Sequence, residues 1–240
     1  MQIGEIQEIY RYPVKSFAGE KLEACVIEEY GMLGDRFVAL YDETKKDWYK
    51  YITARNIPNL LNYRATFQDG EIRITGPDGQ KYGWDEGLLK EIQSQTKTRL
   101  TMSALKEAHP EHPQLLSVDG ASILIITDSS LNKLQQIWGK ELDERRFRAN
   151  FVVKVSDDSI TEGDWIGRRL TVGDVHLQVD SFCQRCVLIT MNPDTQVKDP
   201  TLLRKVNEEF NLHFGVYASV VKTGTIKQGD KVLLDSSIDD

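Results

Sequence analysis

The stretch 65–84, ATFQDGEIRITGPDGQKYGW, contains the clearest structural signal in the sequence. Asp69-Gly70 and Pro77-Asp78-Gly79 are turn-forming combinations, and they flank the alternating segment EIRIT at 71–75. Alternation of apolar and polar residues is typical of a strand with one buried face. The stretch therefore predicts a hairpin, and with it a β-rich first half of the chain.

Further short strands are predicted in the second half. They are FVVKV at 151–155, RRLTVGDVHLQVD at 168–180, VLIT at 187–190, GVYASVV at 215–221 and DKVLL at 230–234. Strands that recur about every ten residues are typical of antiparallel barrels and sandwiches. A helix is predicted after the apolar run ILIIT at 123–127, with Asp128 as its N-cap and Gly139 as its stop. The expected fold is mainly β with some α, an α+β chain.

A change in character near the middle of the chain predicts two domains. Residues 102–119, MSALKEAHPEHPQLLSVD, contain two prolines and two histidines and have no sustained hydrophobic period. We expect this segment to be a connector, with a β-rich domain at 1–115 and a β-barrel or sandwich domain at 116–240. No internal repeat is visible, which excludes solenoids and propellers.

Composition excludes several classes of protein. The 240 residues include 30 basic and 37 acidic side chains, a formal charge of −7, so a general nucleic-acid binder is not expected. No apolar run approaches the length of about 20 residues that spans a membrane, and the N-terminus lacks the order of a signal peptide. The three cysteines are too few for a disulfide framework or a four-thiolate iron–sulfur site. We expect a cytoplasmic protein without membrane or nucleic-acid partners.

The segment Cys183-Gln184-Arg185-Cys186 is the one local motif with obvious reactivity. A zinc knuckle would need two further ligands, and a thioredoxin-like pair would need a helix directly after the strand. Two small buried thiols are the simplest alternative. Arg185 favours a functional role, because a guanidinium next to a thiol stabilises the thiolate that nucleophiles and metal ligands require.

Other polar segments have simple structural explanations when they are taken singly. The predicted strand at 146–151 would place Arg146, Arg148 and Asn150 together on one face, either in solvent or lining an anion pocket. The junction at 127–130 is a helix cap, although free N–H groups there also suit an anion. The sequence contains no HExxH, Walker A, GxGxxG or GxSxG motif, which removes zincins, P-loop enzymes, Rossmann dehydrogenases and standard α/β-hydrolases.

Eight short motifs, weak alone, occur together in a specific order. They are YPVKS at 12–16, DRF at 35–37, TAR at 53–55, FRAN at 147–150, CQRC at 183–186, NPDT at 192–195, FGVY at 214–217 and GTIKQGD at 224–230. In this order the chain resembles the MOSC family, named for the C-terminal domain of molybdenum cofactor sulfurase. It is most similar to the two-part members that include the mitochondrial amidoxime-reducing component. One departure is Gln196, where the family often has glycine after the Asp-Thr pair.

The resemblance implies a β-barrel MOSC domain after a smaller β-rich N-terminal domain, and a molybdenum–molybdopterin cofactor. Cys186 would supply the thiolate bound to molybdenum and would be the catalytic and metal-binding residue, which agrees with the preference of soft metals for sulfur. Further positions match those that hold the pterin and its phosphate: Lys15, Ser16, Arg36, Thr53, Arg55, Ser130, Arg148, Asn150 and Arg185. Converging cations suit an anionic cofactor.

The function implied by this resemblance is reduction of small N-hydroxylated compounds, namely hydroxylamines, N-hydroxylated bases and amidoximes. We expect the protein to have neither the ferredoxin-like domain nor the N-terminal anchor that some relatives of the family carry. Electrons are therefore expected from a separate ferredoxin- or flavodoxin-like protein. Two alternatives stay open: a sulfur carrier or cofactor-handling protein that uses a Cys186 persulfide, and a binding module for another small anion with structural cysteines.

Overall fold

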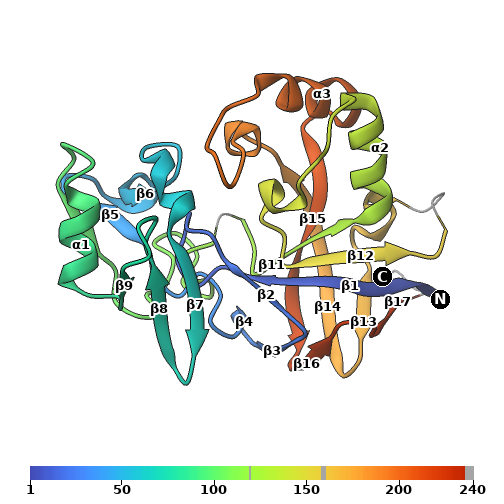
Figure 1. The fold of residues 1–240 in the computed structure, drawn as a ribbon. Coiled ribbons are helices and arrows are strands. Elements are labelled where there is room, and N and C mark those ends of the chain that lie inside the picture. The colour runs from blue at the N-terminus through green and yellow to red at the C-terminus, as the bar shows by residue number, and fades with distance from the viewer. Residues whose placement is uncertain (119, 158–160, 236–240) are drawn as a thin grey trace.

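A closed β-barrel forms the larger part of the molecule (Figure 1). The computed structural model describes residues 1–118, 120–157 and 161–235. Neighbouring barrel strands follow the order β12-β11-β15-β14-β13-β17-β1, and a β12–β1 pairing closes the ring. Their bounds are β1 Gln2–Arg11, β11 Ile123–Thr127, β12 Phe151–Val155, β13 Arg169–Val172, β14 Val175–Gln184, β15 His213–Lys222 and β17 Lys231–Leu234. The pairings are antiparallel except β11–β12, which is parallel.

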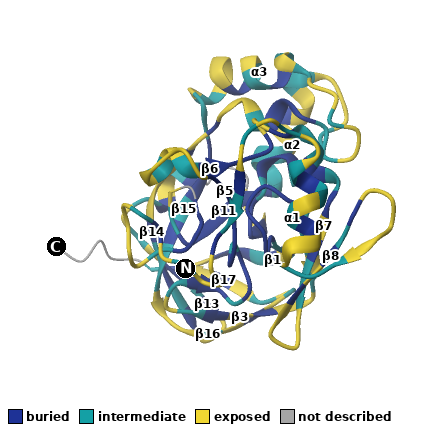
Figure 2. Cartoon of the chain, turned by 90° about the vertical axis from the view of Figure 1, so that its left-hand side faces the viewer, coloured by how far each residue is buried: buried dark blue, intermediate teal, exposed yellow. Residues whose placement is uncertain are grey.

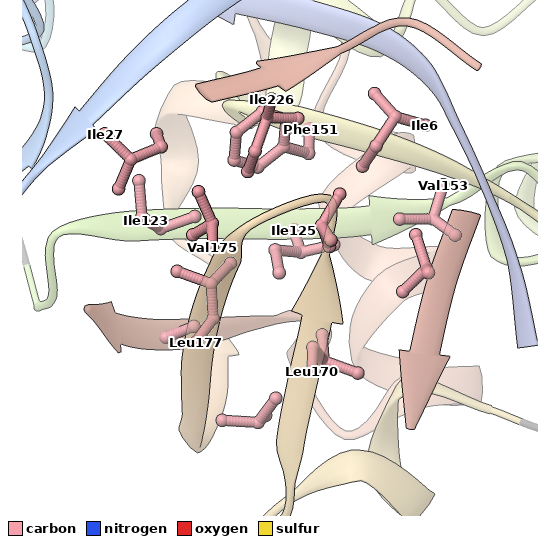
Figure 3. Close-up of a cluster of buried hydrophobic side chains, with 14 of the residues drawn as sticks. Ile6, Ile27, Ile123, Ile125, Phe151, Val153, Leu170, Val175, Leu177 and Ile226 are labelled. Atoms are coloured by element: carbon pink, nitrogen blue, oxygen red, sulfur yellow. The ribbon is translucent and has the colours of Figure 1, made fainter. Parts of the chain in front are cut away.

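Alternating apolar side chains fill the barrel (Figure 3). On β14, for example, Val175, Leu177 and Val179 are buried while the residues between them are partly exposed. This period of two turns one face of each strand inward. Burial of each such side chain stabilises the fold by roughly 1.5–3 kcal/mol. The barrel core therefore explains why the second half of the sequence reads as short alternating strands.

A second, smaller β region packs beside the barrel (Figure 1). It contains two three-stranded sheets: β5 Leu40–Asp42, β6 Tyr51–Ile52 and β10 Leu100–Met102 in one, and β7 Arg64–Gln68, β8 Glu71–Thr75 and β9 Lys81–Tyr82 in the other. Helix α1 Glu86–Gln93 and the 3₁₀ helices η1 Asp47–Lys50 and η2 Pro58–Asn62 belong to the same part of the chain. The predicted hairpin is confirmed, because β7 and β8 pair from Gln68↔Glu71 to Arg64↔Thr75.

Two helices, α2 Asp128–Trp138 and α3 Pro200–Phe210, lie together on the barrel and contact β12 and β15 (Figure 1). The outer side of α3 is largely exposed, whereas the barrel strands beneath are buried (Figure 2). The helix α2 and its stop at Gly139 are as predicted, but its N-cap is Thr127 rather than Asp128. Helix α3 was not predicted; Asp199 caps it and Pro200 begins it.

The prediction of a mainly β fold with some α, a barrel and an N-terminal β region, is confirmed. The boundary after residue 115 remains a proposal. Strand pairing crosses it at two places. Strand β1 pairs with β12 and β17, and β3 Ala24–Glu28 pairs with β16 Gly224–Lys227. The remaining short strands are β2 Glu20–Leu22, beside β1, and β4 Gly31–Met32, beside β3.

Two predicted strands are wrong, and both lie near the candidate site. Residues 187–190 form the 3₁₀ helix η5, and 146–150 contain the end of the 3₁₀ helix η3 (Glu144–Phe147) followed by a left-handed turn at Arg148, φ 54°. Arg146 Nη1 donates to the Ile189 and Thr190 carbonyls at 3.2 and 3.1 Å. The two segments hydrogen-bond to each other and form no strand. The alternation of apolar and polar residues within one segment cannot reveal such a distant partner.

Candidate functional site

Nine of the ten predicted site residues line one cavity of about 430 Å³. They are Lys15, Ser16, Arg36, Thr53, Arg55, Arg148, Asn150, Arg185 and Cys186. The cavity receives side chains from both the N-terminal region and the barrel, so neither half of the chain makes it alone. Its volume lies in the usual range for small-molecule and cofactor sites.

The two cysteines of the CQRC motif have different environments. Cys186 is exposed and lies at the N-cap of η5, whereas Cys183 is 3% exposed and packs in an apolar cluster. Both thiols are free. Among the described residues there is no group of three or more His, Cys, Asp or Glu side chains that could hold a metal ion. Both cysteines contribute to the cavity lining, but only Cys186 is exposed, so its thiol is the more accessible of the two to a ligand.

Arg185 is held rigidly beneath the cavity. The side chain is 8% exposed; its Nε donates to the Phe214 carbonyl at 2.7 Å and its Nη1 to the Phe147 carbonyl at 2.8 Å. Its third nitrogen, Nη2, is buried and has no acceptor among the residues that the structure describes. Gly215, at φ 79°, gives room here, because a Cβ would lie 2.6 Å from the Ile125 carbonyl oxygen. A buried donor without a protein acceptor fits an anionic ligand.

Two further guanidinium groups lie over the ring of Tyr12. The Arg148 and Arg36 guanidinium carbons are 4.3 and 4.7 Å from its centroid. Arg36 Nη2 donates to the Arg148 carbonyl at 2.9 Å, which joins the N-terminal region to the loop before β12. Burial raises the pKa of Tyr12 to about 12, although both guanidinium groups act to lower it. The phenol therefore stays neutral and does not cancel their charge.

Lys15 adds a cation from the turn that follows β1. It is 5% exposed, its Nζ donates to the Ser117 and Val118 carbonyls at 3.0 and 3.3 Å, and it lies over the Trp48 and Tyr51 rings at 4.9 and 4.8 Å. Burial of a cation costs free energy unless it is paired or hydrogen-bonded. These contacts keep the ammonium at the cavity wall.

Other predicted site residues make hydrogen bonds within the cavity wall. Asn150 is 1% exposed; its Oδ1 accepts from the Leu124 amide at 3.1 Å and its Nδ2 donates to the Tyr10 carbonyl at 3.3 Å. Its amide therefore positions the wall of the cavity. Thr53 is buried, and its Oγ1 accepts from the Nε of exposed Arg55 at 3.3 Å.

Ser130 is the exception: it is not among the residues that line the cavity, and its role in cofactor binding stays a prediction. Its Oγ donates to Glu162 Oε2 at 2.6 Å, and the amide and hydroxyl of Thr127 donate to Glu162 Oε1 at 3.0 and 2.9 Å. The strand–helix junction thus does hold an anion, through two hydroxyl groups and the Thr127 amide rather than through the amides of the first helical turn. That anion is the chain's own carboxylate, so the junction is not available to an external phosphate.

Several lining residues were not identified from the sequence. They are Trp48, Ser117, Gly120, Ala121, Ser122, Phe182 and Tyr217, among others. Ser117 belongs to the segment 102–119 that was read as a connector, Gly120, Ala121 and Ser122 follow that segment, and single aromatic residues carry no local signal. A polar segment directly before the buried strand β11 was the one available indication.

Two amide side chains, outside the cavity lining, pair between the two halves of the chain. Asn62 Nδ2 donates to Gln196 Oε1 at 2.9 Å, and Gln196 Nε2 donates to Asn62 Oδ1 at 2.7 Å. Gln196, the departure from the family pattern, adopts φ 56°. Behind this pair, Ala54 and Leu61 pack with Met191 in a small apolar cluster. The pair thus links the N-terminal region to the loop that follows η5.

We expect the Asn62–Gln196 pair to stabilise the molecule measurably. A double-mutant cycle with Asn62→Ala and Gln196→Ala should give a coupling free energy of about 1 kcal/mol, because two reciprocal hydrogen bonds are lost together. Urea unfolding of the four proteins measures it. The exposed Asn59–Gln95 pair, with a single hydrogen bond at 2.8 Å, is the matched control and should couple less. Equal coupling in the two cycles would contradict this role.

The fold and the site together define a β-barrel protein with a cationic cavity around one exposed thiol. The chain belongs to the MOSC family: the model of the MOSC domain matches residues 112–233, and that of the MOSC N-terminal beta barrel domain matches residues 3–114. Among the described residues, no helix has the length and apolar character needed to cross a bilayer.

Similar proteins include an amidoxime reducing component and a molybdenum cofactor sulfurase. Mitochondrial amidoxime reducing component 2 of Homo sapiens is 28% identical over an alignment of 286 residues. The alignment covers 96% of this chain and 83% of that protein. Molybdenum cofactor sulfurase of Drosophila persimilis is 30% identical over 147 residues, 60% of this chain and 17% of that protein. In fold, the chain is similar to the YUAD protein from Bacillus subtilis, with a TM-score of 0.52, 13% identity and coverage of 97% of this chain and 95% of that one.

Proposed function

We propose that the cavity binds a molybdenum–molybdopterin cofactor through Cys186. The protein would then reduce N-hydroxylated compounds such as hydroxylamines, N-hydroxylated bases and amidoximes. The observation that supports this most is the convergence on one cavity of an exposed thiol and cations from both halves of the chain. When bound, the molybdenum centre supplies the two-electron chemistry that removes oxygen from an N–O group.

The residues of the cavity suit this cofactor in charge and in donor type. The thiolate of Cys186 is a soft ligand of the kind that sulfur-bound metals prefer. Arg36, Arg148 and Arg185 would hold the anionic pterin phosphate, since guanidinium groups match phosphate oxygens. The buried Nη2 of Arg185 has no acceptor among the described residues and would donate to the bound anion. Lys15 would add charge where the cavity wall includes Ser117.

The substrate class and the electron source rest on the relatives and on the cysteine count. A relative that covers most of this chain is named for amidoxime reduction. The sequence has three cysteines, one fewer than a four-thiolate iron–sulfur cluster needs, and one of the three is proposed to bind the cofactor. We therefore propose a separate ferredoxin- or flavodoxin-like protein as the donor.

Sulfur transfer is the second candidate. The exposure of Cys186 supports it, because a persulfide carrier needs an accessible thiol. The similarity to a molybdenum cofactor sulfurase is consistent with the same role. In this case Cys183, which is buried, would not readily serve as a resolving thiol.

Metal and pterin analysis separates the two candidates. The protein is produced in a host that makes the cofactor, its molybdenum and pterin contents are measured, and reduction of hydroxylamine is assayed with an artificial electron donor. We expect stoichiometric molybdenum and pterin together with turnover. A labile additional sulfur on Cys186 in the intact mass, without molybdenum, would instead favour the carrier. Absence of molybdenum, pterin and activity would contradict the proposed reductase.

A further inference from the structure

We propose that Phe182 determines substrate specificity, by forming a flat shelf for N-hydroxylated compounds whose reacting group is attached to an aromatic or heteroaromatic ring. This inference rests on the proposed function and refines its substrate class. Phe182 lies near the end of β14, four residues before Cys186, and both side chains line the cavity.

The Phe182 ring is supported from behind. It stacks on the His213 ring with centroids 4.8 Å apart and an angle of 2° between the planes. His213 begins β15, the barrel strand next to β14. Gly163 lies at the edge of the ring, where a Cβ would come within 3.0 Å of Phe182 Cζ. Contacts on one face and at one edge fix the plane of the ring.

The rest of the ring is available to a ligand. Phe182 is 40% exposed, like its neighbours Asp180 and Ser181, although large apolar side chains are usually buried. The pairing of β14 with β15 is irregular between Phe182 and Gln184. Such irregularities commonly re-aim a side chain next to a functional site. An exposed face, a supported back and a place in the cavity wall together make a stacking surface.

The charged and the aromatic residues of the cavity wall suit different parts of the bound molecules. The guanidinium and ammonium groups suit the anionic part of the cofactor, and Phe182 offers no polar atom to it. An aromatic face instead attracts a second flat ring. Such stacking tolerates different ring substituents, because every aromatic ring has a π-face. A small aliphatic substrate has no ring to stack and gains little from Phe182. The expected consequence is discrimination in KM, with kcat set elsewhere.

Two amidoximes with the same reacting group test this. Benzamidoxime carries a phenyl ring and acetamidoxime a methyl group. Phe182→Ala should raise KM for benzamidoxime about tenfold, in the range that loss of one stacked ring produces. KM for acetamidoxime and kcat for both substrates should change less than about twofold. Phe182→Tyr should retain the preference, whereas Phe182→Leu, apolar but not flat, should lose it.

A measurement of substrate binding tests the role of Phe182 independently of the proposed reaction. Binding of both amidoximes to the cofactor-loaded wild-type and Phe182→Ala proteins is measured by calorimetry. Tighter binding of benzamidoxime that disappears in the variant supports the shelf, even if neither amidoxime is reduced, in which case only the proposed reaction fails. Equal effects of the variant on the two compounds, or no effect on either, would overturn the role of Phe182.

Discussion

Cys186→Ser is expected to remove molybdenum from the purified protein and to lower reduction of N-hydroxylated compounds about a hundredfold or more. Loss of groups that only support a metal ligand already costs 10–100-fold, and Cys186 is proposed as the ligand itself. A serine hydroxyl is a harder donor and is not ionised near neutral pH, so it cannot replace the thiolate. Because Cys186 is exposed, the free energy of unfolding should change by less than about 0.5 kcal/mol.

Cys183→Ser is the matched control, three residues earlier in the same motif. Cys183 is 3% exposed in an apolar cluster, so the buried hydroxyl should cost about 1–3 kcal/mol of stability. Molybdenum content of the folded variant should remain close to that of the wild type. The two variants thus have opposite expected phenotypes, measured by metal analysis and chemical unfolding. Retention of molybdenum by Cys186→Ser would contradict the assignment of the metal ligand.

Arg185→Leu is expected to have the second largest effect, on both stability and cofactor content. The variant leaves the buried carbonyl groups of Phe214 and Phe147 without the donors that now bond to them. Each buried group left unsatisfied costs about 1–3 kcal/mol, so we expect a loss of about 2–4 kcal/mol in the free energy of unfolding. The cavity also loses the Nη2 donor proposed to hold the anion, and the cofactor should dissociate readily on dialysis.

Arg145→Leu serves as the comparison for Arg185→Leu. The Arg145 side chain is 40% exposed and pairs with Asp143 and Asp194, each at 2.6 Å. Exposed ion pairs contribute about 0–1 kcal/mol, and Arg145 does not line the cavity. This variant should therefore keep its cofactor. If both variants lost stability and cofactor to the same degree, the special role of the buried guanidinium would be wrong. Arg185→Lys, with a charge but no planar fork, should lie between the two.

Local sequence signals predicted the elements that form locally. The 65–84 hairpin follows from its two turns, and α2 follows from its apolar spacing and its stop at Gly139. The error at the N-cap is small: Thr127 accepts the capping bond from Ser130 in place of Asp128. Such signals involve residues within one or two turns of each other, so the sequence contains them in full.

The secondary structure of segments that are stabilised by distant partners was predicted less accurately from the sequence. VLIT at 187–190 is apolar enough for a strand, yet its carbonyl groups accept hydrogen bonds from Arg146. Arg148 adopts a left-handed backbone conformation where its side chain reaches the Phe17 carbonyl at 2.7 Å. A long-range hydrogen bond can outweigh local propensity, and no window of sequence shows the partner.

The candidate site was predicted from ordered motifs rather than from physical chemistry. Each basic residue, taken alone, looked like an ordinary exposed side chain. Ser130 was carried over with the others, but the structure gives its hydroxyl to Glu162. Phe182 and Trp48 had no signal, because an isolated aromatic residue is usually part of a core. Their place in the cavity wall became visible only in the folded chain.

The sequence by itself determined that this chain is β-rich, acidic and assembled from short strands, because periodicity, turn residues and charge are properties of neighbouring residues. Tertiary structure alone decided which polar groups meet. It exposed Cys186 and buried Cys183, and it placed the Arg185 guanidinium between the carbonyl of Phe214 in β15 and that of Phe147 in η3. The reason is physical: burial and hydrogen-bond partners depend on what the closed barrel and the N-terminal region bring together, and segments more than a hundred residues apart supply them.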